Sequence, residues 1–174
     1  MQLSGSRVIA APRETVWAAL NDADVLKACI NGCQELEKTS DTSFEAVVKQ
    51  KVGPVSATFK GAVELSDLNP PESYRISGEG KGGAAGFAKG GADVKLVEAE
   101  GGTELIYDVD AKIGGKIAQL GSRLIDGFAK KMADQFFETF QKVVEGDDAP
   151  ENPTESDDDA EPGAKKSWLK RIVG

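Results

Sequence analysis

The sequence predicts an α+β domain in which a curved antiparallel sheet is wrapped on a long C-terminal helix. Apolar residues alternate with a period of two through much of residues 34–113, a pattern typical of strands with one buried face. A helical apolar stripe then runs through residues 116–144. Two short helical patterns precede the alternating region. Because 144 residues suffice for one domain with an apolar core, we expect residues 1–144 to form it.

The N-terminal region predicts one strand followed by two short helices. Residues 3–10 form the strand, and Pro12 suits the first residue of the first helix. Asp22 or Asp24 can cap the second helix, which residues 31–32 end. The apolar positions of the first helix are Val16, Trp17 and Leu20.

Residues 34–113 accommodate five to six strands of an antiparallel meander. Turn signals interrupt the alternation at residues 53–54, 67–71 and 101–102. The opposite face of each strand is polar, so one face of the sheet meets solvent. The inward residues of the last strand are Leu105, Tyr107, Val109, Ala111 and Ile113.

Seven glycines occur within residues 78–92, and they include a G-x-G-x-x-G pattern. We reject a dinucleotide site because that pattern needs a helix after it and a parallel sheet around it, whereas both flanks here read as antiparallel strands. Glycines permit sharp bending of a strand and close approach of its backbone. Gly61, Gly78 and Gly80 take inward positions, so either the long helix packs closely there or a cavity remains.

The long helical pattern at residues 116–144 supplies the face that meets the sheet. Its aromatic rings and a methionine lie opposite the glycine-rich wall, where they could line a cavity for a flat or extended apolar molecule. Core packing alone is the alternative interpretation. The stripe consists of Ile117, Leu120, Gly121, Leu124, Ile125, Phe128, Met132, Phe136, Phe140 and Val143. The candidate cavity residues are Phe59, Tyr74, Phe87, Tyr107, Leu120, Leu124, Phe128, Met132 and Phe136.

The chain contains no histidine and only two cysteines, Cys29 and Cys33. It therefore lacks a histidine general base, a nucleophile paired with histidine and a histidine-ligated metal. Two thiols are too few for a structural zinc site, and we expect both to be structural residues of a reduced compartment. We expect no metal and no catalytic residue, although a site made of carboxylates alone remains open.

The order of strand, two short helices, meandering strands and long helix resembles the helix-grip plan of the START-like, or SRPBCC, superfamily, which includes polyketide cyclases. Several motifs, in order, resemble the CoxG family of carbon monoxide dehydrogenase subunits across nearly all of residues 1–144. They are GPVSATFKG (53–61), NPPESY (69–74), GEGKGG (78–83), GFAKG (86–90) and GGKIAQLGSRL (114–124). Asn31 departs from the family, which often has proline there, but asparagine suits a helix end before glycine.

The resemblance implies a non-enzymatic accessory protein of a molybdenum-containing dehydrogenase of the carbon monoxide dehydrogenase type. On this hypothesis the cavity binds an isoprenoid quinone, menaquinone or ubiquinone, and the protein carries it between the membrane and the dehydrogenase for electron transfer. An assembly or recruitment factor with no ligand is one alternative. A cyclase-like enzyme is another, but Asp108 and Asp110 alternate outward, away from the inward apolar positions. A net charge of −3 over residues 1–144 argues against nucleic-acid binding.

The last thirty residues differ in composition from the domain. Residues 145–164 carry nine acidic and no basic side chains, which predicts a disordered linker. Residues 165–174 form a basic amphipathic tip, and we expect the protein to be cytoplasmic and peripheral on the inner face of the membrane. A solubility tail and a docking peptide for a partner protein are the alternatives. The expected membrane-contact residues are Lys165, Lys166, Trp168, Leu169, Lys170, Arg171, Ile172 and Val173.

Deleting residues 165–174 should abolish binding to anionic liposomes, because the deletion removes four basic residues together with the apolar side of the tip. Sedimentation with liposomes of stated anionic content measures the effect. The thermal unfolding of the domain should stay unchanged. Undiminished sedimentation would contradict the membrane-contact assignment.

Overall fold

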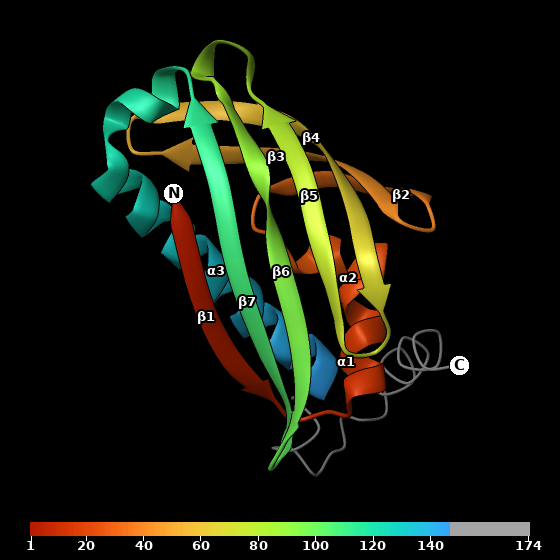
Figure 1. Ribbon diagram of the computed structural model, residues 1–174. Helices are drawn as coiled ribbons and strands as arrows, with labels where there is room; N and C mark the ends of the chain where they lie inside the picture. The colour runs from red at the N-terminus through yellow and green to blue at the C-terminus, as the bar shows by residue number, and fades with distance from the viewer. Residues whose placement is uncertain (147–174) are drawn as a thin grey trace, which may run out of the picture.

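The computed structural model describes residues 1–146 and contains a seven-stranded antiparallel sheet with helices on its concave side (Figure 1). The strands are β1 (Gln2–Ile9), β2 (Cys33–Ser40), β3 (Ser43–Val52), β4 (Val55–Asn69), β5 (Ser73–Lys81), β6 (Phe87–Ala99) and β7 (Gly102–Gly114). The helices are α1 (Arg13–Leu20), α2 (Ala23–Cys29) and α3 (Ser122–Glu145), with short 3-10 turns η1 (Gly83–Ala85) and η2 (Lys116–Leu120). The predicted α+β class and order of elements are confirmed. The linker and tip predicted for residues 145–174 lie almost wholly outside the described residues.

Pro12 and Asp22 are the residues that immediately precede the two short helices. Pro12 has an extended ψ of 156°, so α1 begins one residue later than predicted, at Arg13. Asp22 is the cap of α2, because its Oδ1 accepts hydrogen bonds from the backbone N–H groups of Asp24 at 2.9 Å and Val25 at 3.2 Å. Gly32 follows α2 with a φ of 84°, which suits glycine.

The sheet is a meander from β2 to β7, and β1 pairs with β7 at the far edge, giving the order β1-β7-β6-β5-β4-β3-β2. In this register Gly5 lies opposite Tyr107. The turn predicted at residues 67–71 is shorter than expected, because β4 continues to Asn69 through an irregularity at Asp67, whose φ is 52°. The described residues form seven strands. The sequence indicated one strand followed by five to six, so seven is the upper end of that prediction.

Small residues occupy the middle of the concave face. The register places Ala46, Gly61, Gly80 and Ala88 in one row across β3 to β6. The neighbouring row joins Gly78, Gly90 and Ala111. A methyl group added at Gly80 would meet no atom within 4 Å, so the space in front of this residue is open.

The small residues separate two apolar clusters. The larger cluster lies beneath α1, α2 and the C-terminal half of α3, and the smaller one lies at the other end of the sheet beside η1 and η2. The fully buried members of the larger cluster include Ile9, Val16, Leu96, Leu105 and Phe140. The buried members of the smaller cluster are Val52, Ala85 and Ile117.

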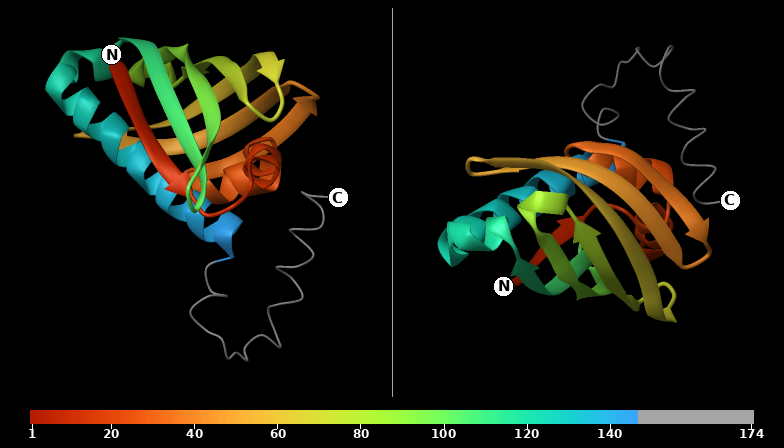
Figure 2. Two further views of the ribbon diagram at one scale, coloured as in Figure 1. Left: turned by 60° about the horizontal axis from the view of Figure 1, so that its bottom comes forward. Right: turned by 90° about the horizontal axis from the view of Figure 1, so that it is seen from above.

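The long helix is shorter than the sequence indicated. Gly121 has a φ of 97° and interrupts the predicted helix, so residues 116–120 form η2 and α3 begins at Ser122. Gly146, in the left-handed conformation, ends α3. Figure 2 shows α3 crossing the concave side of the sheet. Its buried residues, Phe137, Phe140 and Val144, all belong to its C-terminal half.

Replacing Phe140 with alanine should lower the free energy of unfolding by about 3–5 kcal/mol, because the ring is fully buried and its loss leaves a cavity. Phe136 and Phe137 also lose their contacts with this ring. Urea unfolding followed by circular dichroism measures the change. Replacing the exposed Glu138 of the same helix is the control, with an expected change below about 0.5 kcal/mol. A loss below about 1 kcal/mol for Phe140→Ala would show that this ring is not central to the core.

Candidate ligand-binding cavity

A cavity of about 320 Å³ lies between the concave face of the sheet and helices α1, α2 and α3. All seven strands contribute to its wall, and so do the three α-helices. The side chains of this wall are leucine, isoleucine, valine, alanine and phenylalanine, together with Tyr74 and Tyr107. Among the described residues, the two tyrosine hydroxyls are therefore the only polar side-chain groups of the wall.

The structure brings three of the nine predicted cavity residues together on this wall: Tyr74, Tyr107 and Phe136. Phe59, Leu120 and Phe128 instead pack against the smaller apolar cluster, at the end of the sheet near η2. For Leu120 this position follows from Gly121, because the break in the helix assigns Leu120 to η2 rather than to α3.

The last three predicted residues also lie outside the cavity. Phe87 begins β6 on the convex face, where its ring covers Gly114 and is 36% exposed. Leu124 is 40% exposed and packs against the turn at Gly53. Met132 lines a separate groove of about 330 Å³ beside Phe128. The lysines of that groove are Lys49, Lys51 and Lys131.

The prediction missed most of the wall that the short helices provide. Leu20 of α1, Leu26 of α2 and the following Ile30 all line the cavity. Their apolar character was visible, but a helix of seven or eight residues has too few positions to show which side faces a ligand. Ala92 and Ala133 were also missed, because small residues carry little signal of their own.

Aromatic contacts hold the cavity wall in place. The ring of Trp17 meets Tyr74 edge-on with centroids 5.1 Å apart, and Tyr107 stacks on Phe137 at 5.0 Å. The Tyr107 side chain also lies across Gly5, where an added methyl group would stand 2.5 Å from the hydroxyl oxygen. Gly5 therefore leaves the space that this tyrosine occupies.

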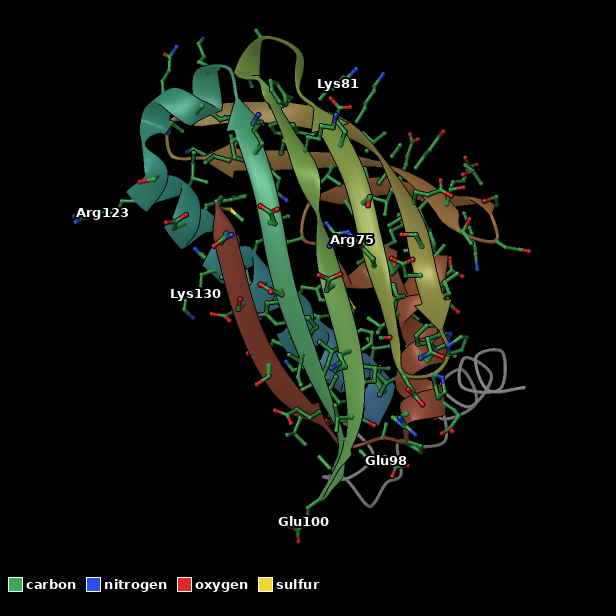
Figure 3. The ribbon with its side chains drawn as sticks, viewed as in Figure 1. Arg75, Lys81, Glu98, Glu100, Arg123 and Lys130 are labelled. Carbon is green, nitrogen blue, oxygen red and sulfur yellow. The ribbon has the colours of Figure 1, made fainter. Side chains whose placement is uncertain are left out.

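No charged side chain of residues 1–146 lines the cavity, although Arg7 and Lys38 lie over the rings of two wall residues, Phe137 and Phe44. Arg75 on β5 forms an ion pair of 3.0 Å with Asp93, its neighbour on β6. Figure 3 shows Arg123 and Lys130 extending from α3 away from the sheet. Asp108 accepts a hydrogen bond of 2.7 Å from the Ser4 hydroxyl on the exposed face. As far as residues 1–146 form it, the wall offers no carboxylate or ammonium group for acid–base chemistry.

Two buried groups, one in the core and one on the cavity wall, have raised pKa values. Burial raises the pKa of the Cys29 thiol to about 12, and it raises the pKa of the Tyr74 hydroxyl above its usual range. Both groups are therefore neutral at physiological pH. Within residues 1–146, no cluster of three or more histidine, cysteine or carboxylate side chains could hold a metal ion.

A curved antiparallel sheet that grips a long C-terminal helix, with two short helices after the first strand, defines a helix-grip protein. Solved structures share this fold. A conserved protein from Geobacillus kaustophilus is 30% identical, with a TM-score of 0.79, over 84% of this chain and 96% of that one. A Thermus thermophilus protein is 15% identical, with a TM-score of 0.64, over 84% of this chain and 98% of that one. A Chromobacterium violaceum protein is 14% identical, with a TM-score of 0.64, over 83% of this chain and 96% of that one.

The family model for CoxG, a carbon monoxide dehydrogenase subunit, matches residues 5–145. The chain therefore belongs to this family, as the motifs in the sequence indicated. A search of curated proteins found no match. Across the part of the chain that the structure describes, no helix has the length and apolar character needed to span a membrane.

The two thiols should differ in reactivity. Cys29 is 2% exposed and its raised pKa keeps it protonated, so at pH 8 we expect it to react with iodoacetamide at least about a hundredfold more slowly than Cys33. Burial also raises the pKa of Cys33, but Lys27 opposes this effect and the residue is more accessible. Mass spectrometry of labelled Cys29→Ser and Cys33→Ser variants measures each rate. Equal rates in the folded protein would contradict the assignment of Cys29 to the core.

Proposed function

We propose that this protein is a non-enzymatic accessory protein of a molybdenum-containing dehydrogenase of the carbon monoxide dehydrogenase type. It binds an isoprenoid quinone, menaquinone or ubiquinone, in its apolar cavity and carries the quinone between the cytoplasmic membrane and the dehydrogenase. Electrons from the dehydrogenase then reach the respiratory chain through this quinone. The apolar cavity is the observation that carries the proposal.

The size and chemistry of the cavity favour such a ligand. Pockets that bind small molecules span about 300–1,000 Å³, so a cavity of about 320 Å³ suits a quinone ring and the first part of its chain. The small residues in the middle of the concave face, such as Gly80, leave further open space for an extended tail. Burial of a hydrocarbon against this wall releases water from apolar surface on both sides.

Family membership supports the choice of partner. The matching family is named for a subunit of carbon monoxide dehydrogenase, and the match covers residues 5–145. A carrier needs a surface for its partner, and the convex face of the sheet is available because the helices lie on the concave side. We assign the dehydrogenase contact to that exposed side of the protein.

The chemistry of the wall disfavours a cyclase-like enzyme. Such an enzyme positions polar groups around its substrate to move protons, whereas only Tyr74 and Tyr107, of the residues described, bring polar side chains to this cavity. The rest of this wall is hydrocarbon and so cannot exchange a proton with either hydroxyl. A carrier needs only affinity and release, both of which an apolar wall supplies.

The membrane part of the proposal rests on the C-terminal sequence. Residues 165–174 lie outside the described residues, and their four basic side chains and Trp168 favour contact with anionic lipid. Residues 147–164 contain acidic side chains and no basic ones, so repulsion keeps this segment away from anionic headgroups. The protein is then peripheral on the inner face of the membrane.

Native mass spectrometry of the protein purified from its host, followed by organic extraction, tests the proposal. We expect a quinone in about equimolar amount. A protein that is empty, and that also fails to bind added quinone, would contradict the carrier function. That result would favour an assembly factor whose cavity is only structural.

Filling the cavity should weaken quinone binding. Replacing Ala92 on the concave face with phenylalanine should lower affinity for menadione, a naphthoquinone without an isoprenoid tail, at least about tenfold, because the added ring occupies the cavity. The matched control is Ala62→Phe, which adds the same ring to the exposed face of β4. Isothermal titration calorimetry measures both affinities. Equal affinities of the two variants would place the binding site outside the cavity.

A further inference from the structure

The Tyr74 hydroxyl is a buried polar group with no partner among residues 1–146. The residue is 5% exposed, yet its hydroxyl makes no hydrogen bond within this part of the chain. A hydroxyl group loses its bound water on burial, and leaving it without a new partner costs free energy. Buried hydroxyl groups are therefore nearly always hydrogen-bonded. The lack of a partner in the described protein therefore indicates that another molecule supplies one.

The Tyr74 oxygen borders the cavity rather than packed protein. Among the described residues, Arg13 Nε is the only side-chain nitrogen or oxygen that is both sealed off by neighbouring atoms and unpaired. The Tyr74 oxygen therefore contacts open space, and the open space beside this residue is the cavity. An atom placed there from a ligand is within reach of the hydroxyl.

The surrounding contacts fix the direction of this hydroxyl. Tyr74 takes the concave face of β5, opposite Val94, and the edge of the Trp17 ring packs against it at 5.1 Å. Rotating the tyrosine out of the cavity would break this aromatic contact and expose a largely buried ring. The hydroxyl is thus held in position before any ligand arrives. Because burial raises its pKa, the group stays protonated at physiological pH and can donate.

We propose that Tyr74 is the polar recognition residue of the cavity and that its hydroxyl donates a hydrogen bond to a carbonyl oxygen of the ligand. The class of ligand is a flat or extended hydrocarbon that bears a carbonyl group. This inference rests on the binding of a small molecule in the cavity, as proposed above, but not on that molecule being a quinone. The apolar wall supplies affinity, and Tyr74 distinguishes a carbonyl compound from a plain hydrocarbon.

Tyr107 is the natural comparison, because it is the only other tyrosine of the chain. It lies in the same row of the sheet, two strands from Tyr74, at a Cα distance of about 10 Å. Its hydroxyl lies over Gly5 of the edge strand β1, and the residue is less buried than Tyr74. We therefore assign Tyr107 to the margin of the cavity and expect its hydroxyl to contribute less.

Three probes with similar ring systems test the assignment by calorimetry on the full chain. Menadione carries two carbonyl groups, tetralone carries one and methylnaphthalene carries none. Tyr74→Phe should weaken binding of both carbonyl probes about five- to tenfold, the effect of losing one hydrogen bond in a buried site. The affinity for methylnaphthalene should stay within about twofold. Tyr107→Phe should weaken binding of the carbonyl probes less than Tyr74→Phe does.

The outcomes separate this inference from the proposed function. Unchanged menadione affinity in Tyr74→Phe would overturn the role of the hydroxyl while leaving a quinone carrier intact. Tetralone binding that depends on Tyr74, without any binding of menadione, would support the hydroxyl role and contradict the quinone. A loss shared equally by methylnaphthalene would overturn the inference, because it reports altered packing. A greater loss in Tyr107→Phe would also overturn it, and unchanged thermal unfolding of both variants excludes misfolding as the cause.

Discussion

The lack of side-chain volume in the middle of the concave face is the constraint on which the rest of the structure depends. Glycine and alanine in adjacent strands let the sheet curve and leave α3 unsupported over that stretch. Apolar clusters can then form only at the two ends of the sheet, where side chains are large enough to meet the helices. The cavity lies within the larger cluster, and its apolar wall is part of the protein core.

Much of the fold could be predicted from the sequence, because its signals are local and repeated. Alternation placed Phe59 and Leu65 on the inner face of β4, and the capping chemistry of Asp22 or Asp24 placed the start of α2 to within two residues. The structure differs from the prediction where the backbone conformation of one residue overrides the apolar pattern around it. The apolar stripe of residues 116–144 continues through Gly121, but the positive φ of that glycine divides the segment into η2 and α3.

The cavity could be predicted only in part, because its wall depends on how distant elements meet. Tyr74 and Tyr107 were recognisable as inward aromatic residues, because the alternation in their strands showed which positions face the helices. Phe87 was not, because it stands where η1 ends and β6 begins, and its side of the sheet depends on the strand that follows. Leu20 and Leu26 reach the cavity through the packing of α1 and α2, which the pattern of either helix alone does not show.

The uneven burial of α3 has a kinetic consequence. Local opening costs least where few apolar contacts are lost, and the buried residues of α3 all follow Phe136. The first turns of the helix, near Leu124, can therefore detach from the sheet in fluctuations that leave the turns around Phe140 in place. Amide hydrogen exchange would then be faster at the start of the helix than at its end.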